Sequence, residues 1–151
     1  MHTTSYFHKP IAQKELVQFL YTIDNDYHPK ISKHMPINDY AQKLLNFASI
    51  DFTRDEEGTL SSIVAYYLNQ ETKIAYVSIV GTNKENRRKG LSRNLCSLCI
   101  ENSKKYRMRI IRIPVTKTNN SALSLYLSLG FRKSQELTHE NPEKIYLDLV
   151  L

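Results

Sequence analysis

The sequence predicts an α/β or α+β fold in which helices cover both faces of a central sheet. Two observations support this prediction. Apolar residues recur at helical spacing in four segments and at strand spacing in seven others, and the two kinds of segment are interspersed along the chain. The chain has 151 residues, 41% of them hydrophobic and 24% charged, which is typical of one folded domain. We therefore expect a single domain over residues 1–151.

The first half of the chain begins with a short strand, expected at 5–8, and two amphipathic helices. Pro10 opens the first helical stretch and Pro36 the second, and in both the apolar residues lie on one side. After the second helix, the spacing of the apolar residues becomes that of strands, and polar turns separate these strands. These three strands are expected at 48–54, 59–68 and 74–80.

The second half of the chain alternates helix and strand. A helix is expected from Gly90 to about Tyr106, followed by a strand at 109–115. A short helix with one apolar side then ends at Gly130, because glycine is common at the end of a helix. Two closing strands are expected at 132–137 and 144–150. The resulting order is β-α-α-β-β-β-α-β-α-β-β.

The charge of the chain favours an anionic partner without identifying it. There are 21 Lys and Arg residues against 15 Asp and Glu, a formal net charge of +6. Arg87, Arg88 and Lys89 are adjacent and precede a glycine, whereas the basic residues from 104 to 112 are irregularly spaced and are expected on a solvated face. Known nucleic-acid-binding signatures are lacking, so a basic nucleic-acid-binding module is the less favoured interpretation.

Signals for membranes, export and metals are weak. No apolar run approaches the ~20 residues of a membrane span, and the first residues lack the pattern of a secretory leader, so we expect a cytoplasmic protein without membrane contact. Cys96 and Cys99 form a C-x-x-C pattern on the apolar side of a helical segment, which predicts buried structural thiols. No second cysteine pair or histidine array accompanies them, and no metal site is expected.

The loop between Gly81 and Gly90 has the features of an anion-binding site. It is polar throughout, follows a strand and precedes the start of a helix. The first N–H groups of a helix have no partner within the helix and carry partial positive charge. Gly90 would let a phosphate approach the backbone, while Arg87, Arg88 and Lys89 would add charged donors. The loop matches neither the P-loop nor the Rossmann glycine pattern.

Two motifs resemble those of the GCN5-related N-acetyltransferase (GNAT) family. Residues 87–92 read R-x-x-G-x-S, similar to the acetyl-CoA loop Q/R-x-x-G-x-G/A of that family, with Ser92 where the family has glycine or alanine. Residues 119–131 resemble its N-x-x-A-x-x-L-Y-x-x-x-G-F motif at every fixed position. The resemblance covers about residues 74–133. It implies a mixed, mostly antiparallel sheet with a splayed pair of parallel strands and acetyl-CoA as co-substrate.

In that family the pantetheine arm lies between the splayed strands. Gly81 would permit a bulge there. Pro114 marks either the point of divergence or the end of its strand. The resemblance assigns backbone groups of residues 80–82 to the pantetheine, backbone N–H groups of residues 88–93 to the pyrophosphate, and the side chains of Arg87 and Lys89 to phosphates. The residues expected to bind acetyl-CoA are Val80, Gly81, Thr82, Arg87, Arg88, Lys89, Gly90, Leu91, Ser92, Arg93 and Asn119.

The match places Tyr126 at the general-acid position of the family, where a phenol can donate to the thiolate that leaves the thioester. The alternative for Tyr126 is a core aromatic residue, and both roles are compatible. The general base stays open, because the strand at 74–80 has no carboxylate. Tyr76 and Ser78 could order a water, His28, Asp24 or Asp26 in the loop between the first two helices could act as the base, or the amine could arrive neutral. The polar residues expected around the acceptor are Tyr21, Asp24, Asp26, Tyr27, His28 and His34.

The expected function is transfer of an acetyl group from acetyl-CoA to the primary amine of a small molecule, an amino sugar or a peptide. A non-catalytic sensor of acyl-CoA with the same fold is the alternative, favoured only by the missing strand carboxylate. The identity of the acceptor, the length of the acyl group and the choice between monomer and homodimer stay open. Function in this fold depends on the acceptor pocket, which varies between proteins.

Overall fold

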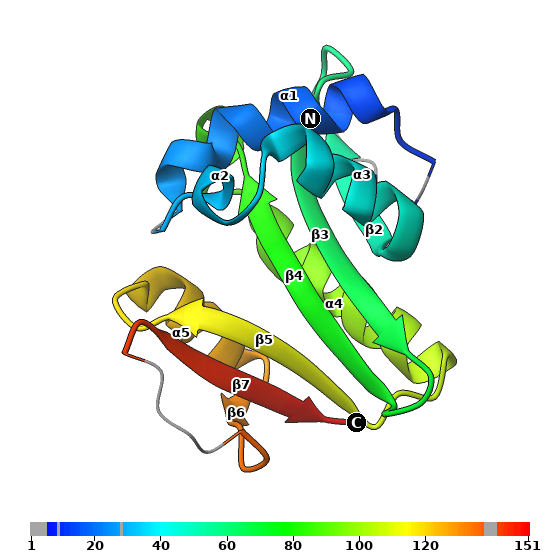
Figure 1. Ribbon diagram of the computed structural model, residues 1–151, viewed down its shortest axis with the longest axis vertical. Helices are drawn as coiled ribbons and strands as arrows, with labels where there is room; N and C mark the ends of the chain where they lie inside the picture. Colours follow the sequence, from blue (N-terminus) through cyan, green and yellow to red (C-terminus); the bar gives the residue numbers. More distant parts are fainter. Residues whose placement is uncertain (1–5, 9, 28, 138–141) are drawn as a thin grey trace.

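The computed structural model describes residues 6–8, 10–27, 29–137 and 142–151, which form a mixed sheet flanked by helices (Figure 1). The strands are β1 (Tyr6–His8), β2 (Ser49–Arg54), β3 (Leu60–Asn69), β4 (Ile74–Thr82), β5 (Ile110–Thr116), β6 (Arg132–Lys133) and β7 (Lys144–Val150). The helices are α1 (Gln13–Ile23), α2 (Ile31–His34), α3 (Ile37–Phe47), α4 (Leu91–Lys105) and α5 (Asn120–Ser128), with short 3-10 helices η1 (Asp24–Asp26) and η2 (Lys84–Asn86).

The four expected helices and the seven expected strands are all present in the described residues, and Ser5 lies outside them. Two differences have local causes. The strand expected at 132–137 is only two residues long, because the Ser134 hydroxyl accepts the N–H of Leu137 (3.1 Å) and donates to Asp148 Oδ2 (2.7 Å), so the chain turns there. Helix α2 was not expected, since four residues are too few to show an apolar period.

The sheet has the order β1-β2-β3-β4-β5-β7-β6, and every neighbouring pair is antiparallel except β4 and β5. The parallel ladder between β4 and β5 is short: it joins Ile74–Tyr76 to Ile110–Arg112 and goes no further. Beyond it the two strands separate, so that the sheet divides into a β1–β4 part and a β5–β7–β6 part (Figure 1). The predicted splayed parallel pair is therefore confirmed.

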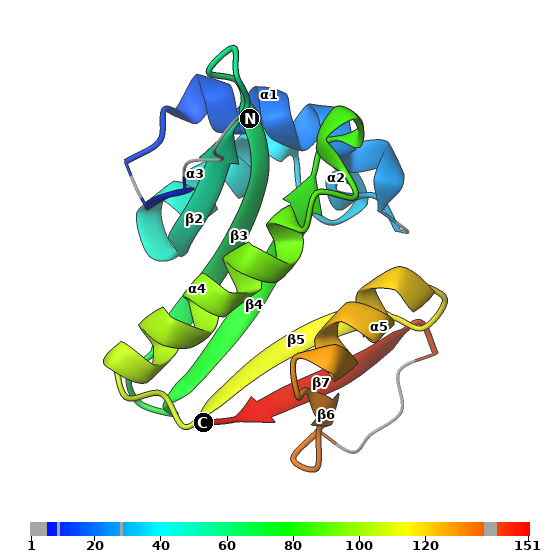
Figure 2. The same cartoon turned by 180° about the vertical axis from the view of Figure 1, so that it is seen from behind.

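Helices cover both faces of the sheet. α1 and α3 pack on one face of the β1–β4 part and α4 on its opposite face, while α5 covers the β5–β7–β6 part on the same side as α4 (Figure 2). The apolar side of α1, including Leu16 and Leu20, is fully buried against β2 and β3. Cys96 and Cys99 lie on the buried side of α4, and burial raises the pKa of the Cys96 thiol to about 12, so these are structural thiols as expected. None of the described helices is long and apolar enough to cross a bilayer.

The bulge in β4 lies at Ser78, and the expectation that Gly81 provides it is wrong. Ala65 is opposite Ile79 and Tyr66 is opposite Val77, which leaves Ser78 as the extra residue. Gly81 instead pairs regularly with Ile63. Its hydrogen side chain leaves room for α1, because a Cβ at Gly81 would lie 2.7 Å from Ile23 Cδ1.

Candidate active site

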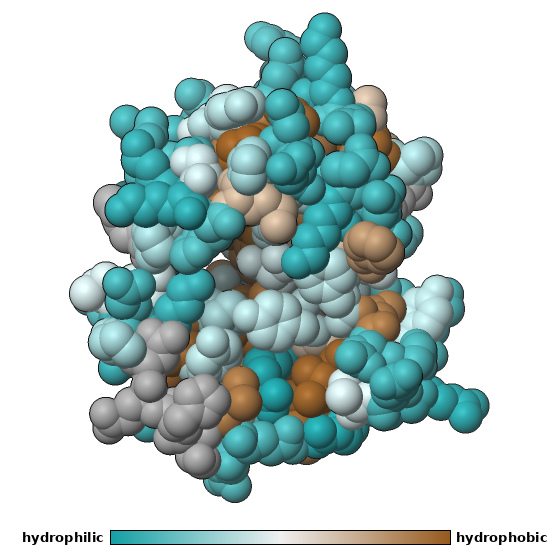
Figure 3. Space-filling model, viewed as in Figure 1, coloured by the Kyte–Doolittle hydropathy of each residue, from teal (hydrophilic) through white to brown (hydrophobic). Residues whose placement is uncertain are grey.

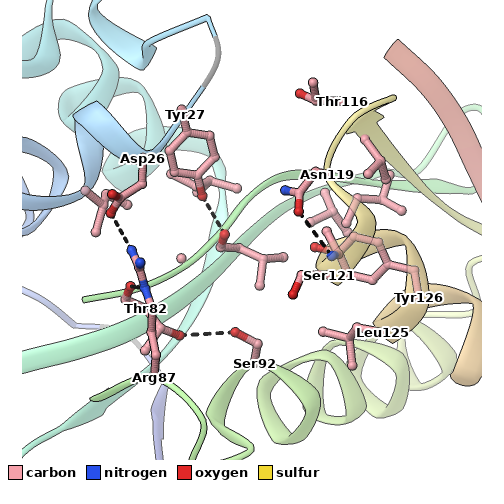
Figure 4. A pocket seen from close by; sticks show the side chains of 18 of the residues that line it. Asp26, Tyr27, Thr82, Arg87, Ser92, Thr116, Asn119, Ser121, Leu125 and Tyr126 are labelled. Carbon is pink, nitrogen blue, oxygen red and sulfur yellow. Dashed lines mark hydrogen bonds and ion pairs between the residues drawn. The ribbon is translucent and has the colours of Figure 1, made fainter. Parts of the chain in front are cut away.

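A cavity of about 830 Å³ opens where β4 and β5 separate (Figure 4). Its walls are β4 from residue 77 onward, β5 from residue 113 onward, the start of α4 and one side of α5. In the described part of the sheet, the facing edges of β4 and β5 have no partner strand beyond Tyr76 and Arg112. Their backbone N–H and C=O groups can therefore bind an extended ligand as an added strand would.

Pro114 lies in the cavity wall, two residues beyond the last parallel pair at Arg112. It is in the middle of β5 and opposite Tyr146 of β7, so the interpretation that it only marks the end of a strand is wrong. Proline has no backbone N–H to offer a neighbouring strand. Its position agrees with the expected divergence of the two strands.

The start of α4 forms one end of the cavity. Gly90 precedes the helix with φ 74°, a conformation that glycine adopts without strain, and Arg88 also has a positive φ of 64°. No side chain caps this helix, so its first N–H groups are open to a ligand. The Thr82 and Ser92 hydroxyls, 3.1 Å apart, connect the end of β4 to the first turn of α4. These donors fit a phosphate group.

The basic side chains of the loop differ in their contacts. Arg87 donates to the Thr82 carbonyl oxygen (3.2 Å) and is paired with Asp26, so it ties the loop to the segment after α1. Arg93 donates to Ser128 Oγ on α5 (2.7 Å). Lys89 donates to Asn86 Oδ1 (3.1 Å) and is not part of the cavity wall. The remaining residues expected to bind acetyl-CoA all line the cavity: Val80, Gly81, Thr82, Arg87, Arg88, Gly90, Leu91, Ser92, Arg93 and Asn119.

Helix α5 brings Asn119 and Tyr126 to the opposite wall (Figure 4). Asn119 caps the helix by accepting the N–H of Ala122 (3.2 Å). Tyr126 is 6% exposed, and its ring packs against Phe131 with centroids 5.9 Å apart. Burial raises the pKa of Tyr126 well above its usual value, and the neighbouring Cys96 and Tyr27 add to the rise. The phenol is therefore protonated at neutral pH.

A second pocket of about 280 Å³ adjoins the cavity between α2, α3 and the separated strands. Tyr27 borders both, with its hydroxyl donating to the Val80 carbonyl oxygen at 2.5 Å. Tyr76 lines the second pocket, and Ser78 lines both. The hydroxyl groups of Ser78 and Tyr40 are 2.5 Å apart.

Only some of the described residues that were expected around the acceptor line one of the two pockets. Tyr27 and His34 line the second pocket, while Asp26 lies at the cavity and is paired with Arg87. Asp24 accepts from the hydroxyl of Ser32 (2.6 Å) and lines neither pocket, nor does the exposed Tyr21. His28 lies outside the described residues.

Sequence reasoning missed Tyr40 and Lys43, which α3 brings to the second pocket. Both lie in the helix that was expected after Pro36, and the helical pattern indicated the helix but not a pocket. Their pocket role depends on contacts between distant parts of the chain, because 38 positions separate Tyr40 from Ser78. No local pattern could have indicated it.

Comparison with known proteins agrees with this geometry. The model of the acetyltransferase (GNAT) family matches residues 17–131. No curated protein sequence matches the chain. An acetyltransferase of the GNAT family from Staphylococcus aureus Mu50 has a similar structure, with TM-score 0.77, 11% identity and coverage of 98% of this chain and 99% of that one.

Two further solved structures are similar. They are the ribosomal-protein-S18-alanine N-acetyltransferase from Escherichia coli (TM-score 0.75, 16% identity, 97% of this chain and 94% of that one) and Arabidopsis thaliana NAA60 with a bisubstrate analogue (TM-score 0.74, 15% identity, 97% and 98%). At such identities the neighbours establish the fold. Because the family model spans residues 17–131, the chain belongs to the acetyltransferase (GNAT) family and is an acyltransferase.

Proposed function

We propose that the protein transfers an acetyl group from acetyl-CoA to the primary amine of an acceptor bound in the second pocket. The observation that carries this proposal is the meeting of two pockets at the separated strands. The larger cavity extends from the start of α4 to Tyr126, and the smaller pocket joins it at Ser78 and Pro114. A long ligand in the first and an amine in the second would therefore come together between β4 and β5.

The residues of the cavity suit the parts of acetyl-CoA. The open N–H groups at the start of α4 would hold the pyrophosphate, and the Arg88 and Arg93 side chains would add positive charge. The backbone N–H groups of β4 from Val80 to Thr82 would bind the pantetheine, since the Val80 and Thr82 carbonyl oxygens already accept from Tyr27 and Arg87, with Asn119 across the gap. Arg87 already binds Asp26, so we expect its main role to be holding the loop in place.

Tyr126 would assist departure of the thiolate. When the amine nitrogen attacks the thioester carbonyl carbon, the new C–N bond forms and the C–S bond breaks. A thiol has a pKa of ~8.5 and is therefore a stronger acid than a buried phenol. A hydrogen bond from Tyr126 to the leaving sulfur is then more favourable than complete proton transfer. The proton that the nitrogen loses after its attack, as the amide forms, would protonate the thiolate.

The acceptor also has to lose a proton before it attacks, since ammonium has no lone pair. The Tyr40 and Ser78 hydroxyls, 2.5 Å apart, lie in the second pocket where the amine would enter. Burial raises the pKa of Tyr40, so it stays neutral and serves as a hydrogen-bond relay rather than a base. We expect this pair to pass the proton to water.

Calorimetry and a thiol assay test the proposal together. Titration with acetyl-CoA should give saturable binding, and addition of primary amines should release free CoA, which DTNB detects. Binding without thiol release from any amine would favour the acyl-CoA sensor. Absence of acetyl-CoA binding, with salt-sensitive binding of RNA or DNA, would favour the nucleic-acid-binding module and contradict the proposal.

A further inference from the structure

Among the described residues, the side chains with a formal charge that line the second pocket are two lysines, Lys43 from α3 and Lys144 from β7. The imidazole of His34 from α2 lines it as well. Lys43 also lies over the ring of Tyr67, with Nζ 5.7 Å from the ring centroid, a contact that restricts the position of this ammonium group. Two separate elements of the fold thus place lysine side chains in the lining of one small pocket.

Hydroxyl groups provide the other polar lining of this pocket. Tyr40 and Ser78 are hydrogen-bonded to each other, and Tyr76 is 36% exposed on the same strand as Ser78. Burial raises the pKa values of Tyr40 and Tyr76, so both phenols remain protonated donors. Lysine ammonium groups with neutral hydroxyl donors form a set that binds carboxylate or phosphate oxygens.

The pocket is open on the face of the molecule drawn in Figure 3, where the surface is hollowed between the α2–α3 half and the β5–β7 half. Most of the surface around this hollow is hydrophilic. The volume of about 280 Å³ is at the lower limit of small-molecule sites, which usually have ~300–1,000 Å³. It therefore suits a small molecule.

From this arrangement we infer that the acceptor is a small amine that also carries an anionic group, either a carboxylate or a phosphate. The inference rests on the proposed function and names the substrate class of that site. The amine would lie at Ser78, where the two pockets meet, and the anionic group would face Lys43 and Lys144. Polyamines and other polycations would be repelled by the same groups.

The lysine charges of the pocket also explain how an amine can react beside β4, a strand that has no carboxylate to act as a general base. In the part of the chain that the structure describes, the titratable groups that line this pocket are Tyr27 after η1, His34 on α2, Tyr40 and Lys43 on α3, Tyr76 on β4 and Lys144 on β7. Nearby positive charge disfavours the ammonium form of a bound amine. Asp26, which lines the first cavity, is already paired with Arg87. The pocket thus favours an acceptor whose amine is neutral and whose second group, the carboxylate or phosphate, is negatively charged.

Matched pairs of amines test this inference on the purified full chain with acetyl-CoA. O-phosphoethanolamine is compared with ethanolamine, and β-alanine with β-alaninamide, by thiol release; spermidine serves as a polycation. We expect kcat/KM to be about tenfold or more higher for the anionic member of at least one pair, mainly through KM. The two pairs separate a phosphate acceptor from a carboxylate acceptor. Equal or better use of the neutral amines or of spermidine would overturn the inference.

Charge variants identify the responsible side chains. Lys43→Gln and Lys144→Gln should each reduce the anionic preference several-fold, whereas Lys43→Arg should retain it. Lys33→Gln is the matched control, because Lys33 is exposed on α2 beside His34 but does not line the pocket. If Lys33→Gln reduced the preference as much as Lys43→Gln, the pocket assignment would be wrong.

A binding measurement separates this inference from the proposed function. Thiol release with equal preference for neutral amines would leave the acetyltransferase proposal intact and overturn the inference alone. If no amine released thiol, the transfer proposal would fail, and the binding of each pair would still be measurable from backbone NMR shifts of Tyr76 and Ser78. Tighter binding of the anionic member of a pair, measured from these shifts, would then support the charge selectivity. Equal binding of the anionic and neutral members would contradict it.

Discussion

Tyr126 illustrates how one buried residue can serve both packing and chemistry. Its ring packs against Phe131 while the residue borders the cavity, so removal of the hydroxyl alone should leave the fold intact. We expect Tyr126→Phe to lower turnover by roughly 10–100-fold with little change in acetyl-CoA affinity, since the hydrogen bond acts on the leaving sulfur. Thiol release detected with DTNB measures the turnover, and calorimetry measures the acetyl-CoA affinity. Tyr106→Phe, an exposed phenol at the end of α4, is the control.

The prediction for Tyr126 would be contradicted by turnover equal to that of the Tyr106→Phe control. In that case Tyr126 would be only a core aromatic residue. A parallel loss of acetyl-CoA affinity would instead assign the hydroxyl to binding.

Gly81 is needed for close packing of α1 against β4. A Cβ there would lie 2.7 Å from Ile23 Cδ1 and 3.3 Å from Tyr27 Oη, so both neighbours would have to move. We expect Gly81→Ala to lower the free energy of unfolding by about 1–3 kcal/mol, as overpacking usually does. It should also raise KM for the amine, because Tyr27 borders both pockets.

A double-mutant cycle tests the cause of this loss. Ile23→Val removes Cδ1, the closest atom, so the stability cost of Gly81→Ala should be smaller in the Ile23→Val background. Urea unfolding of the four proteins gives the coupling free energy. Simple additivity of the two costs would contradict the steric explanation.

The role of the start of α4 in acetyl-CoA binding can be tested at Gly90, with Gly58 in the turn between β2 and β3 as the control. Gly90 and Gly58 both have positive φ, 74° and 80°, and a Cβ at either would meet no atom within 4 Å. Alanine at each should therefore cost a similar amount of stability, about 1–2 kcal/mol, from backbone strain alone. Only Gly90→Ala should also weaken acetyl-CoA binding, because Gly90 borders the cavity. Calorimetry that finds equal affinity in both variants would remove the start of α4 from the binding site.

Local patterns predicted the helices and strands but not the features set by distant contacts. The apolar period of α3 and the glycine before α4 are visible in the sequence. The bulge at Ser78 is not, because it depends on the register between β3 and β4. The contact of Tyr40 with Ser78 likewise joins residues far apart in the chain. The cavity loop was predictable because a short contiguous motif encodes it, whereas the acceptor pocket combines residues of several elements.

The two parts of the sheet meet at the short parallel ladder between β4 and β5. The parallel ladder ends with Tyr76 opposite Arg112, and the Arg112 side chain, 8% exposed, forms the centre of an ion-pair cluster beside it. Its guanidinium donates to Asp148 Oδ1 (2.8 Å) and Oδ2 (3.0 Å) and to Glu136 (2.9 Å), and Arg109 donates to Glu136 as well. The cluster connects β5, β7 and the segment after β6, and so holds the β5–β7–β6 part together beside the point where the strands separate.

Acid should weaken this junction through Glu136. Hydrogen bonds from Arg109 and then Arg112 lower the pKa of Glu136 from 4.5 to about 2. A carboxylate whose pKa is lowered by folding contributes stability above its unfolded pKa, and this contribution disappears as the pH falls from 4.5 toward 2. Glu136→Gln should therefore be less stable than the parent at pH 7, with the difference shrinking steadily below pH 4.5. Urea unfolding across this range measures it, with Glu101→Gln, exposed on α4, as control. A stability difference independent of pH would mean that Glu136 contributes through packing rather than through its charge.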